Sequence, residues 1–319
     1  KTYGTQLVCS KSIWAKMLKN SILRFVAIFL LVGFLPSVGV CGDIKPTTST
    51  VLKPGLSAHV FDITGSSGIN DLQIIFIESH KTKYAPHLIG GTGRIGSARY
   101  SFPATLAEIN FDDAPVVISG SYSGRFGGGL QPLGYLKSDG AEISARFHHS
   151  WIVDTVFCAD PRKSTSLLYS VDPTESIIGD AVARTTFGMY ADCVQTGPEL
   201  FKSGENVIDG RQVIKDEQTD RPDPVERYIS TLRIQLFLCK ADADPDSPLG
   251  IGITTDKVEL SQLNKSLPNL TIESRKVCQN VVALSGSGSA GMLINGSLVA
   301  GSSSFLVTSA IAFVRNGQK

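Results

Sequence analysis

The sequence has no excess of charge of either sign. Thirty basic residues stand against 29 acidic ones in 319 positions, which leaves a formal charge of +1 at pH 7. Proteins that bind nucleic acid attract its phosphates through an excess of Lys and Arg. Because this chain has no such excess, we expect no nucleic-acid partner.

The N-terminal apolar run is short for a membrane-spanning helix. Phe25–Leu35 is uncharged, whereas a helix that spans a bilayer needs about 20 apolar residues. Lys16, Lys19 and Arg24 precede this run and small residues follow it, which is the pattern of a secretory signal peptide. We predict that residues 1–42 consist of upstream residues and a signal peptide, which extends from about Met17 to Gly42. We therefore predict a secreted or periplasmic protein. The alternative is a membrane anchor, and we expect contact with a membrane only through this segment if it stays uncleaved.

Metal-ligand spacing is also missing. Past residue 42 the chain has four cysteines, and no two of them lie in a Cys-x-x-Cys arrangement. Zinc sites use such closely spaced pairs, so we predict no metal. An even number of cysteines in an exported chain indicates two disulfides, with three possible pairings. We predict Cys158–Cys193 and Cys239–Cys278, because each pair flanks one contiguous block of predicted strands.

No internal repeat or low-complexity tract divides the remaining chain. Residues 43–57 are rich in Thr, Ser and Pro and are predicted to be a linker. Residues 58–319 are long enough for one large domain with its own core, and we predict that they form one.

Short apolar runs characterise this domain. Leu72–Glu78 and Leu232–Leu238 have the length and composition of strands. Short helices are predicted over Phe102–Ile109 and Val258–Leu267, the second from its apolar spacing and the proline that follows it. The pair Asp139-Gly140 predicts a type I′ hairpin turn. We therefore predict an α+β fold of mixed, largely antiparallel sheets with few helices.

One glycine-rich stretch, Gly91–Gly96, contains a literal Gly-x-Gly-x-x-Gly. A dinucleotide-binding fingerprint needs a preceding strand, a following helix and an acid about twenty residues further on. Pro103 interrupts the candidate helix early, and no acid lies at a suitable strand end. We therefore favour a surface loop over the dinucleotide alternative and predict no cofactor.

Near the C-terminus a predicted strand opens into a loop of small residues. Val281–Leu284 has the β-branched content of a buried strand, and Ser285–Ser289 alternates serine with glycine. Such a stretch exposes its backbone N–H groups and can form a concavity that binds an anion. Ser304–Val314 then closes the chain as a final strand. This arrangement mounts a site at a sheet edge.

Two earlier segments have related features. Val116–Ile118 is a predicted buried strand that opens into the segment Ser119–Ser123. A Gly-Pro pair ends the segment Gln195–Pro198 and predicts a tight turn that presents Gln195 and Thr196. Their amide and hydroxyl groups suit a sugar or phosphate oxygen. The alternative is a purely structural turn after a buried strand.

Together these segments resemble the phosphodiester glycosidase family, which comprises enzymes like the N-acetylglucosamine-1-phosphodiester "uncovering enzyme" and bacterial exopolysaccharide-associated relatives. The resemblance extends over about residues 58–314 and depends on short motifs in the same order. Matching positions are Ile118, Gly120, Tyr122, Gln195, Thr196, Gly197, Pro198, Ala283, Leu284, Gly286, Gly288, Ser289, Met292, Asn295 and Gly296. The chain departs from the family at two positions, where Ser119 replaces an Asn and Ser285 replaces an Asp.

The resemblance implies hydrolysis of a sugar-1-phosphodiester, with a carbohydrate or phosphorylated glycan as the partner. In the family, an arginine-bearing segment follows the Gly-Pro turn, and guanidinium binds phosphate in a bidentate manner. Among Arg221, Arg227 and Arg233 we choose Arg227, because Arg233 lies within a predicted strand. The predicted substrate-binding set is Ser119, Gly120, Tyr122, Gln195, Thr196, Gly197, Arg227, Gly286, Gly288 and Ser289.

The departure at Ser285 affects the expected chemistry. Glycoside cleavage normally uses carboxylates as acid and as base or nucleophile, whereas a serine hydroxyl needs a partner to act near neutral pH. Our first hypothesis is an active exported glycosidase in which the catalytic set is Ser285 with Asp192 or Glu199 as the acid. The second is a catalytically impaired relative that binds a phosphorylated or anionic glycan through the same pocket.

Overall fold

The computed structural model describes residues 42–63, 72–80, 83–95, 98–109, 114–120, 122–126, 129–145, 153–163, 165–171, 185–208, 229–242, 247–286 and 289–316. The chain divides into two units, Lys1–Asp43 and Ile44–Lys319, and all elements named below belong to the second. Apart from Gly42, the predicted signal peptide lies outside the described residues. Within them, no helix is both long and apolar enough to cross a membrane.

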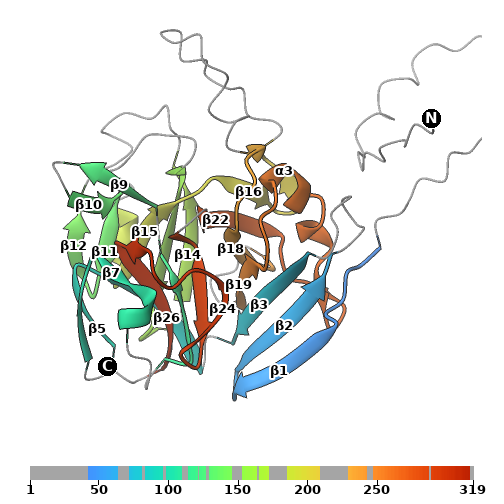
Figure 1. The fold of residues 1–319 in the computed structure, drawn as a ribbon, viewed down its shortest axis with the longest axis horizontal. Helices are drawn as coiled ribbons and strands as arrows, with labels where there is room; N and C mark the ends of the chain where they lie inside the picture. Colours follow the sequence, from blue (N-terminus) through green and yellow to red (C-terminus); the bar gives the residue numbers. More distant parts are fainter. Residues whose placement is uncertain are drawn as a thin grey trace, which may run out of the picture. The chain divides into compact units, whose positions relative to one another are not determined.

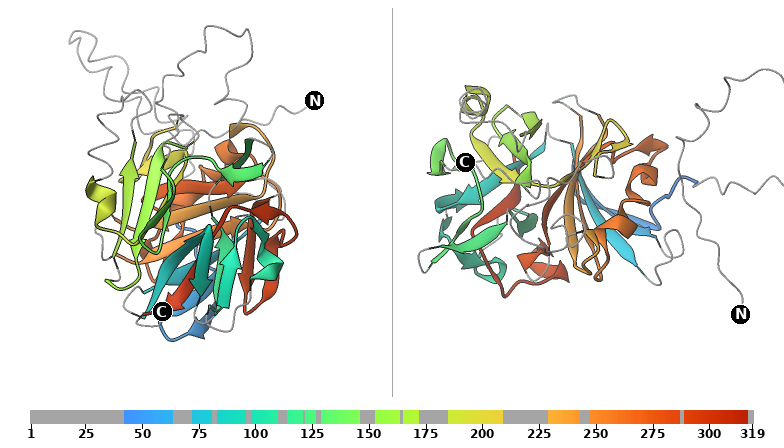
Figure 2. Two further views of the ribbon diagram at one scale, coloured as in Figure 1. Left: turned by 90° about the vertical axis from the view of Figure 1, so that its left-hand side faces the viewer. Right: turned by 90° about the horizontal axis from the view of Figure 1, so that it is seen from above.

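Antiparallel strands make up most of the described chain (Figure 1). The largest sheet has eight strands and joins the N-terminal strands of the unit to strands from its C-terminal half, which lie side by side in Figure 2. In spatial order its members are β1 (Thr48–Lys53), β2 (Leu56–Asp62), β3 (Gln73–Ser79), β19 (Leu249–Thr254), β18 (Gln235–Lys240), β22 (Asn280–Gly286), β16 (Glu199–Lys202) and β17 (Glu205–Asn206).

Two further sheets have five strands each. The first contains, in spatial order, β24 (Ser297–Gly301), β23 (Gly291–Ile294), β8 (Val116–Ser119), β26 (Ser309–Arg315) and β4 (Tyr84–Gly90). The second contains β12 (Ala141–Ser144), β11 (Leu136–Ser138), β15 (Asp192–Thr196), β13 (Thr155–Asp160) and β14 (Thr165–Ser170).

Short ribbons and single helical turns complete the described unit. The two-stranded ribbons are β5 (Thr92–Ile95) with β6 (Ala98–Ser101), β7 (Ala104–Thr105) with β25 (Leu306–Val307), β9 (Ser123–Phe126) with β10 (Gly129–Pro132), and β20 (Thr271–Ile272) with β21 (Arg275–Lys276). The helical turns include α3 (Leu260–Leu263) and the 3-10 turns η1 (Leu106–Glu108) and η3 (Leu267–Asn269).

One apolar core draws on all three large sheets. It includes Leu284 of β22, Ile118 of β8 and Val194 of β15, each fully buried. Burial of one such side chain stabilises the fold by about 1.5–3 kcal/mol. Because the three strands that carry the predicted site segments pack into the same core, their ends are held close to one another.

The structure bears out part of the predicted fold class and corrects two predictions of local structure. The α+β prediction holds for the largely antiparallel sheets, but the described chain is mostly β. The segment Phe102–Ile109 forms β7 and a 3-10 turn rather than a helix, because Ala104 and Thr105 pair with β25. The helix predicted over Val258–Leu267 is reduced to α3 and followed by η3. Tertiary pairing has overridden weak local propensity in these segments.

The predicted linker is also part of the compact unit. β1 lies within residues 43–57 and pairs along its length with β2, and Ile44 forms a bridge with Leu270. Thr, Ser and Val favour extended structure, and an edge strand tolerates their exposure to solvent. A composition typical of a linker therefore describes an edge strand here.

The structure also tests the predictions for the Asp139-Gly140 pair and for the glycine-rich stretch. Asp139 and Gly140 both have positive φ, 54° and 83°, and they join β11 to β12, which confirms the predicted hairpin turn. The surface loop predicted from Gly91 is wrong, because Thr92–Ile95 forms β5, which pairs with β6 in a hairpin. This is not the strand, turn and helix that a dinucleotide site requires.

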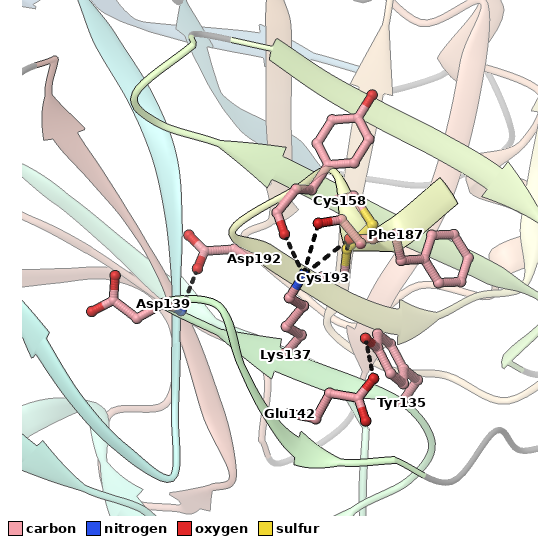
Figure 3. Close-up of a disulfide and its surroundings, with 10 residues drawn as sticks. Tyr135, Lys137, Asp139, Glu142, Cys158, Phe187, Asp192 and Cys193 are labelled. Carbon is pink, nitrogen blue, oxygen red and sulfur yellow. Dashed lines mark hydrogen bonds between the residues drawn. A yellow bond between two sulfur atoms is a disulfide. The ribbon is translucent and has the colours of Figure 1, made fainter. Parts of the chain in front are cut away.

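Both predicted disulfides are confirmed. Cys158 of β13 and Cys193 of β15 are directly opposite in register, with a Cα–Cα distance of 4.0 Å (Figure 3). Cys239 of β18 is bonded to Cys278, with a Cα–Cα distance of 4.7 Å. The bridges close loops of 35 and 39 residues, for which loop entropy predicts a stabilisation of roughly 4 kcal/mol each.

One buried histidine predicts a dependence of stability on pH. His59 of β2 is buried, and its Nδ1 lies 2.8 Å from Ser49 Oγ. Burial lowers the pKa of His59, and nearby Arg275 acts in the same direction, whereas Glu78 and Glu273 oppose the shift. The unfolded chain keeps a pKa near 6.5, so it binds the proton more readily than the folded state.

We therefore expect the free energy of unfolding to decrease as pH falls from 7.5 to 5.5, and to level off once the pH lies below the folded pKa. Denaturant unfolding at both pH values measures this loss. His59→Gln is expected to reduce the difference between them, whereas His80→Gln, at a side chain that is 59% exposed, is expected to leave it in place. A pH dependence that is the same in the His59 variant would contradict this assignment.

Candidate functional site

The described ends of the three predicted segments meet at one place. Ser119 ends β8 and Ser285 lies near the end of β22, and their Oγ atoms are 3.3 Å apart. Each of these residues is only 1% exposed. Thr196, at the end of β15, donates its hydroxyl to the carbonyl oxygens of Ala283 and Leu284, at 2.8 and 2.9 Å. The structure thus brings together the three segments as predicted. We call Ser119 and Ser285 the serine pair.

Backbone contacts hold Ser119 in position. Its Oγ accepts a hydrogen bond from the N–H of Gly291, at the start of β23, at 3.1 Å. The next residue, Gly120, donates its N–H to the Ser309 carbonyl oxygen at 2.9 Å. A Cβ on Gly120 would lie 2.9 Å from the carbonyl carbon and oxygen of Ser309, so only glycine permits this close approach.

The Gly-Pro turn is fastened to β22 beside Ser285. Gly197 donates its N–H to the Ala283 carbonyl oxygen at 3.0 Å, and Ala283 donates back to the Pro198 carbonyl oxygen at 3.0 Å. With the two contacts of the Thr196 hydroxyl, these bonds join the second five-stranded sheet to the eight-stranded one. The turn therefore anchors the strand that carries Ser285.

Gln195 does not face a ligand in this arrangement. Its side chain is fully buried. Oε1 accepts a hydrogen bond from the Tyr135 N–H at 3.1 Å, and Nε2 donates to the Val153 carbonyl oxygen at 2.7 Å. The expectation that the turn presents Gln195 is therefore not met, because both ends of the amide hold backbone.

Asp192, a predicted catalytic acid, is also turned inward (Figure 3). It is 0% exposed. Its Oδ2 lies 2.7 Å from His87 Nδ1 and 3.2 Å from the Leu88 N–H, and its Oδ1 accepts the Asp139 N–H at 2.8 Å. This carboxylate joins β15, β4 and the β11–β12 turn. Sequence reasoning missed His87, which is 105 residues from Asp192 and stands in no motif.

Glu199, the other predicted acid, lies away from the serine pair. In β16 it is opposite Val282, three residues before Ser285, which is a distance of about 10 Å along a strand. Glu199 Oε2 accepts the Ser170 hydroxyl at 2.9 Å, and the side chain lines a cavity of about 360 Å³. The structure therefore does not bring Glu199 to Ser285.

The remaining predicted residues divide into two groups. Gly286 pairs with Gln235 at the end of β22, Ser289 is half-buried just before β23, and the Tyr122 side chain packs against an apolar cluster on the eight-stranded sheet. Arg227 and Gly288 lie outside the described residues. Arg233, the alternative arginine, forms a backbone bridge with Val258.

The described part of the site thus contains hydroxyl groups rather than acids. Among the hydrogen bonds of the described residues, the serine pair contacts no carboxylate. The described part of the chain also contains no group of three His, Cys, Asp or Glu side chains that could hold a metal ion. Such a site suits the binding of oxygen atoms on an anion or a sugar.

Comparison with known proteins adds the fold. No protein-family model matches the chain, and no curated protein matches it, but solved structures do. The described chain has a phosphodiester glycosidase-like fold. It is similar to the catalytic domain of zebrafish N-acetylglucosamine-1-phosphodiester alpha-N-acetylglucosaminidase, auto-inhibited by its pro-peptide, with a TM-score of 0.56 and 18% identity over 82% of this chain and 84% of that one.

A second solved structure is a hypothetical protein from Synechocystis. Its TM-score is 0.50, with 12% identity over 82% of this chain and 63% of that one. At such low identities the likeness shows the fold alone, and the activity has to be argued from the residues.

Proposed function

We propose that this chain is an exported hydrolase of the phosphodiester glycosidase type, which binds a sugar-1-phosphodiester at the serine pair and cleaves the glycosyl–phosphate bond. The observation that supports it is the meeting of Ser119, Ser285 and the Thr196 turn, in a fold shared with a glycosidase catalytic domain. These are the segments in which the sequence resembles that family.

In this proposal the phosphate binds where the backbone of β22 leaves the sheet. The residues from Gly286 to Ser289 supply N–H groups, which suit an anion because they carry partial positive charge. Arg227 is the proposed guanidinium partner of the phosphate oxygens. The carbohydrate is the part of the substrate that distinguishes it from other phosphodiesters.

The chemistry places a small demand on a general acid. The group that leaves the anomeric carbon is a phosphate ester, which is a far weaker base than the alkoxide that leaves an ordinary glycoside. Hydrogen bonds to its oxygens can stabilise the developing charge without full proton transfer. The proposal therefore assigns no proton transfer to Asp192, because both of its carboxylate oxygens are in contact with protein groups. It assigns none to Glu199 either, because Glu199 is opposite Val282, three residues along β22 from Ser285.

Binding without turnover is the second candidate function. It is favoured by the serine pair itself, because Ser285 stands where the resembling family has an aspartate and its side chain contacts another hydroxyl, that of Ser119. In that case the chain would hold a phosphorylated or anionic glycan and release it unchanged.

Export is part of both candidates. Two disulfides support an oxidising compartment, because the cytosol keeps most thiols reduced. The proposed location is therefore the periplasm or the outside of the cell. The near-zero net charge supports a glycan rather than a nucleic acid as the partner.

A hydrolysis assay tests the proposal. The protein, produced with both disulfides formed, is incubated with a nucleotide sugar and with an aryl sugar-1-phosphodiester, and the released free sugar is measured. We expect free sugar in an amount equal to that of the other product, which is a nucleoside diphosphate from the nucleotide sugar and an aryl phosphomonoester from the aryl compound. Saturable binding of the intact compounds with no free sugar would instead support the second candidate. If neither binding of the intact compounds nor release of sugar is observed, the proposed site is wrong.

A further inference from the structure

A second polar cavity lies at the opposite end of β22 from the serine pair. Its volume is about 360 Å³, and β14, β16, β18 and β22 contribute to its lining. Asn280, the first residue of β22, lines it and is five residues from Ser285, which corresponds to about 16 Å along a strand. The cavity is therefore separate from the site described above.

The cavity wall contains an amide donor that the protein does not satisfy. Asn280 is 9% exposed, and its Oδ1 accepts the Ser203 N–H at 3.0 Å. Its Nδ2 is buried and has no hydrogen-bond partner among the described residues. A buried donor without a partner destabilises the fold, because the hydrogen bonds that it makes to water in the unfolded chain are not replaced. A fold that retains such a donor at a cavity is adapted to an acceptor oxygen supplied by a ligand.

The charges around this donor balance. Lys240, only 2% exposed, and Lys202 line the cavity together with Glu199 and Asp242. Among the described lining residues, two positive and two negative side chains give no net charge that selects an anion or a cation. They offer both donors and acceptors, which matches groups that donate and accept at once, as hydroxyl groups do.

One side of the cavity is apolar. Leu168 of β14 lines it on the strand face that also carries Ser170, the partner of Glu199, whereas the ring of the adjacent Tyr169 packs against Phe187 on the other face, with ring centroids 5.4 Å apart. Ligand pockets typically combine such a surface with a few fixed polar groups, in volumes of about 300–1,000 Å³. An aliphatic surface beside donors and acceptors suits the C–H face and the hydroxyl edge of a sugar ring.

From these observations we infer that the Asn280 cavity is a second ligand site, which binds a neutral saccharide unit. Asn280 Nδ2 donates to a sugar oxygen, the carboxylate of Glu199 or Asp242 accepts a sugar hydroxyl, and Leu168 packs against the ring. This site does not depend on hydrolysis at the serine pair, so one proposal can fail while the other stands.

Titration with small sugars tests the inference. Glucose and N-acetylglucosamine are the neutral probes and inorganic phosphate is the anionic probe, with binding followed by saturation-transfer NMR and by chemical-shift titration. Asn280→Asp keeps the Oδ1 acceptor for the Ser203 N–H, replaces the NH₂ donor with an acceptor oxygen and adds a negative charge, for which the control variant below is matched. We expect it to weaken binding of a neutral sugar about tenfold, which corresponds to one charge-free hydrogen bond at the upper end of its usual range.

Asn206→Asp is the matched control, because Asn206 Oδ1 also accepts a backbone N–H, that of Ile208 at 3.1 Å, and the residue is exposed at the sheet edge. It is expected to leave sugar binding unchanged. Asp242→Asn, at the exposed rim, is expected to weaken sugar binding about threefold. This variant provides the test if the Asn280 variant does not fold. Three results would overturn the inference: binding of phosphate alone, binding of no probe, or equal binding of sugars to every variant. The cavity would then be merely hydrated.

Discussion

Replacing both members of the serine pair, Ser119→Asn with Ser285→Asp, is expected to raise the rate of sugar-1-phosphodiester hydrolysis by about 10²–10⁴-fold, the usual effect of a general acid or base. The two changes restore the residue types that the resembling family has at these positions. The gain should be largest if the unmodified protein is almost inert. Ser285→Asp alone should provide most of it, since only this change introduces a titrating group.

The structure predicts a stability cost for the single change. Ser285 is 1% exposed, so its replacement by aspartate places a carboxylate in a buried position and raises the pKa of that carboxyl group. The Ser119 hydroxyl is one available donor, since its Oγ accepts from Gly291 and lies 3.3 Å away. An asparagine amide at position 119 could accept from Gly291 and donate to the new carboxylate at once. The double variant is therefore expected to be more stable than the Ser285→Asp variant.

Four proteins measure both effects: the parent, the two single variants and the double variant, each assayed for kcat/KM and for the free energy of unfolding. Ser304→Asp, at an exposed position, controls for the added charge and is expected to change neither. If the parent already turns over at a rate that the double variant does not improve, the acids lie elsewhere and the binding-only function is excluded. A folded double variant as inert as its parent would show that the site is misplaced.

Asp192→Asn is expected to destabilise the protein by about 3–5 kcal/mol, the usual cost of removing one partner from a buried charged network. The two carboxylate oxygens accept the Leu88 and Asp139 N–H groups and contact His87. An amide has only one acceptor oxygen. Whichever way it is turned, its NH₂ group faces a backbone N–H, so one buried donor loses its partner.

Thermal and denaturant unfolding measure this loss, which corresponds to a decrease in Tm of roughly 5–15 °C for a domain of this size. Asp256→Asn is the matched control, because Asp256 also accepts a backbone N–H, that of Lys257 at 2.6 Å, but is exposed. It should shift the free energy of unfolding by less than about 0.5 kcal/mol. If the Asp192 variant keeps its stability but loses turnover, Asp192 takes part in catalysis.

Local sequence predicted the features that depend on neighbouring residues. The Asp139-Gly140 turn follows from the positive φ that its type requires. The pairing of Cys158 with Cys193 followed from one contiguous block of strands, since β13 and β15 are adjacent in the second five-stranded sheet. The order of the three small-residue segments indicated that they belong to one site, and their described ends do meet.

The direction in which the site side chains face was decided by tertiary structure. Every residue of β15 is buried, so both faces of the strand are covered and the alternation that separates core from solvent is absent. Sequence could therefore not tell that Asp192 and Gln195 bind backbone from β4, from the residues on either side of β11 and from the segment before β13. The partners are tens of residues away, and the contacts exist only because the sheets pack against one another. β1 is a similar case. Its composition is that of a linker, and it forms a strand because it pairs with β2.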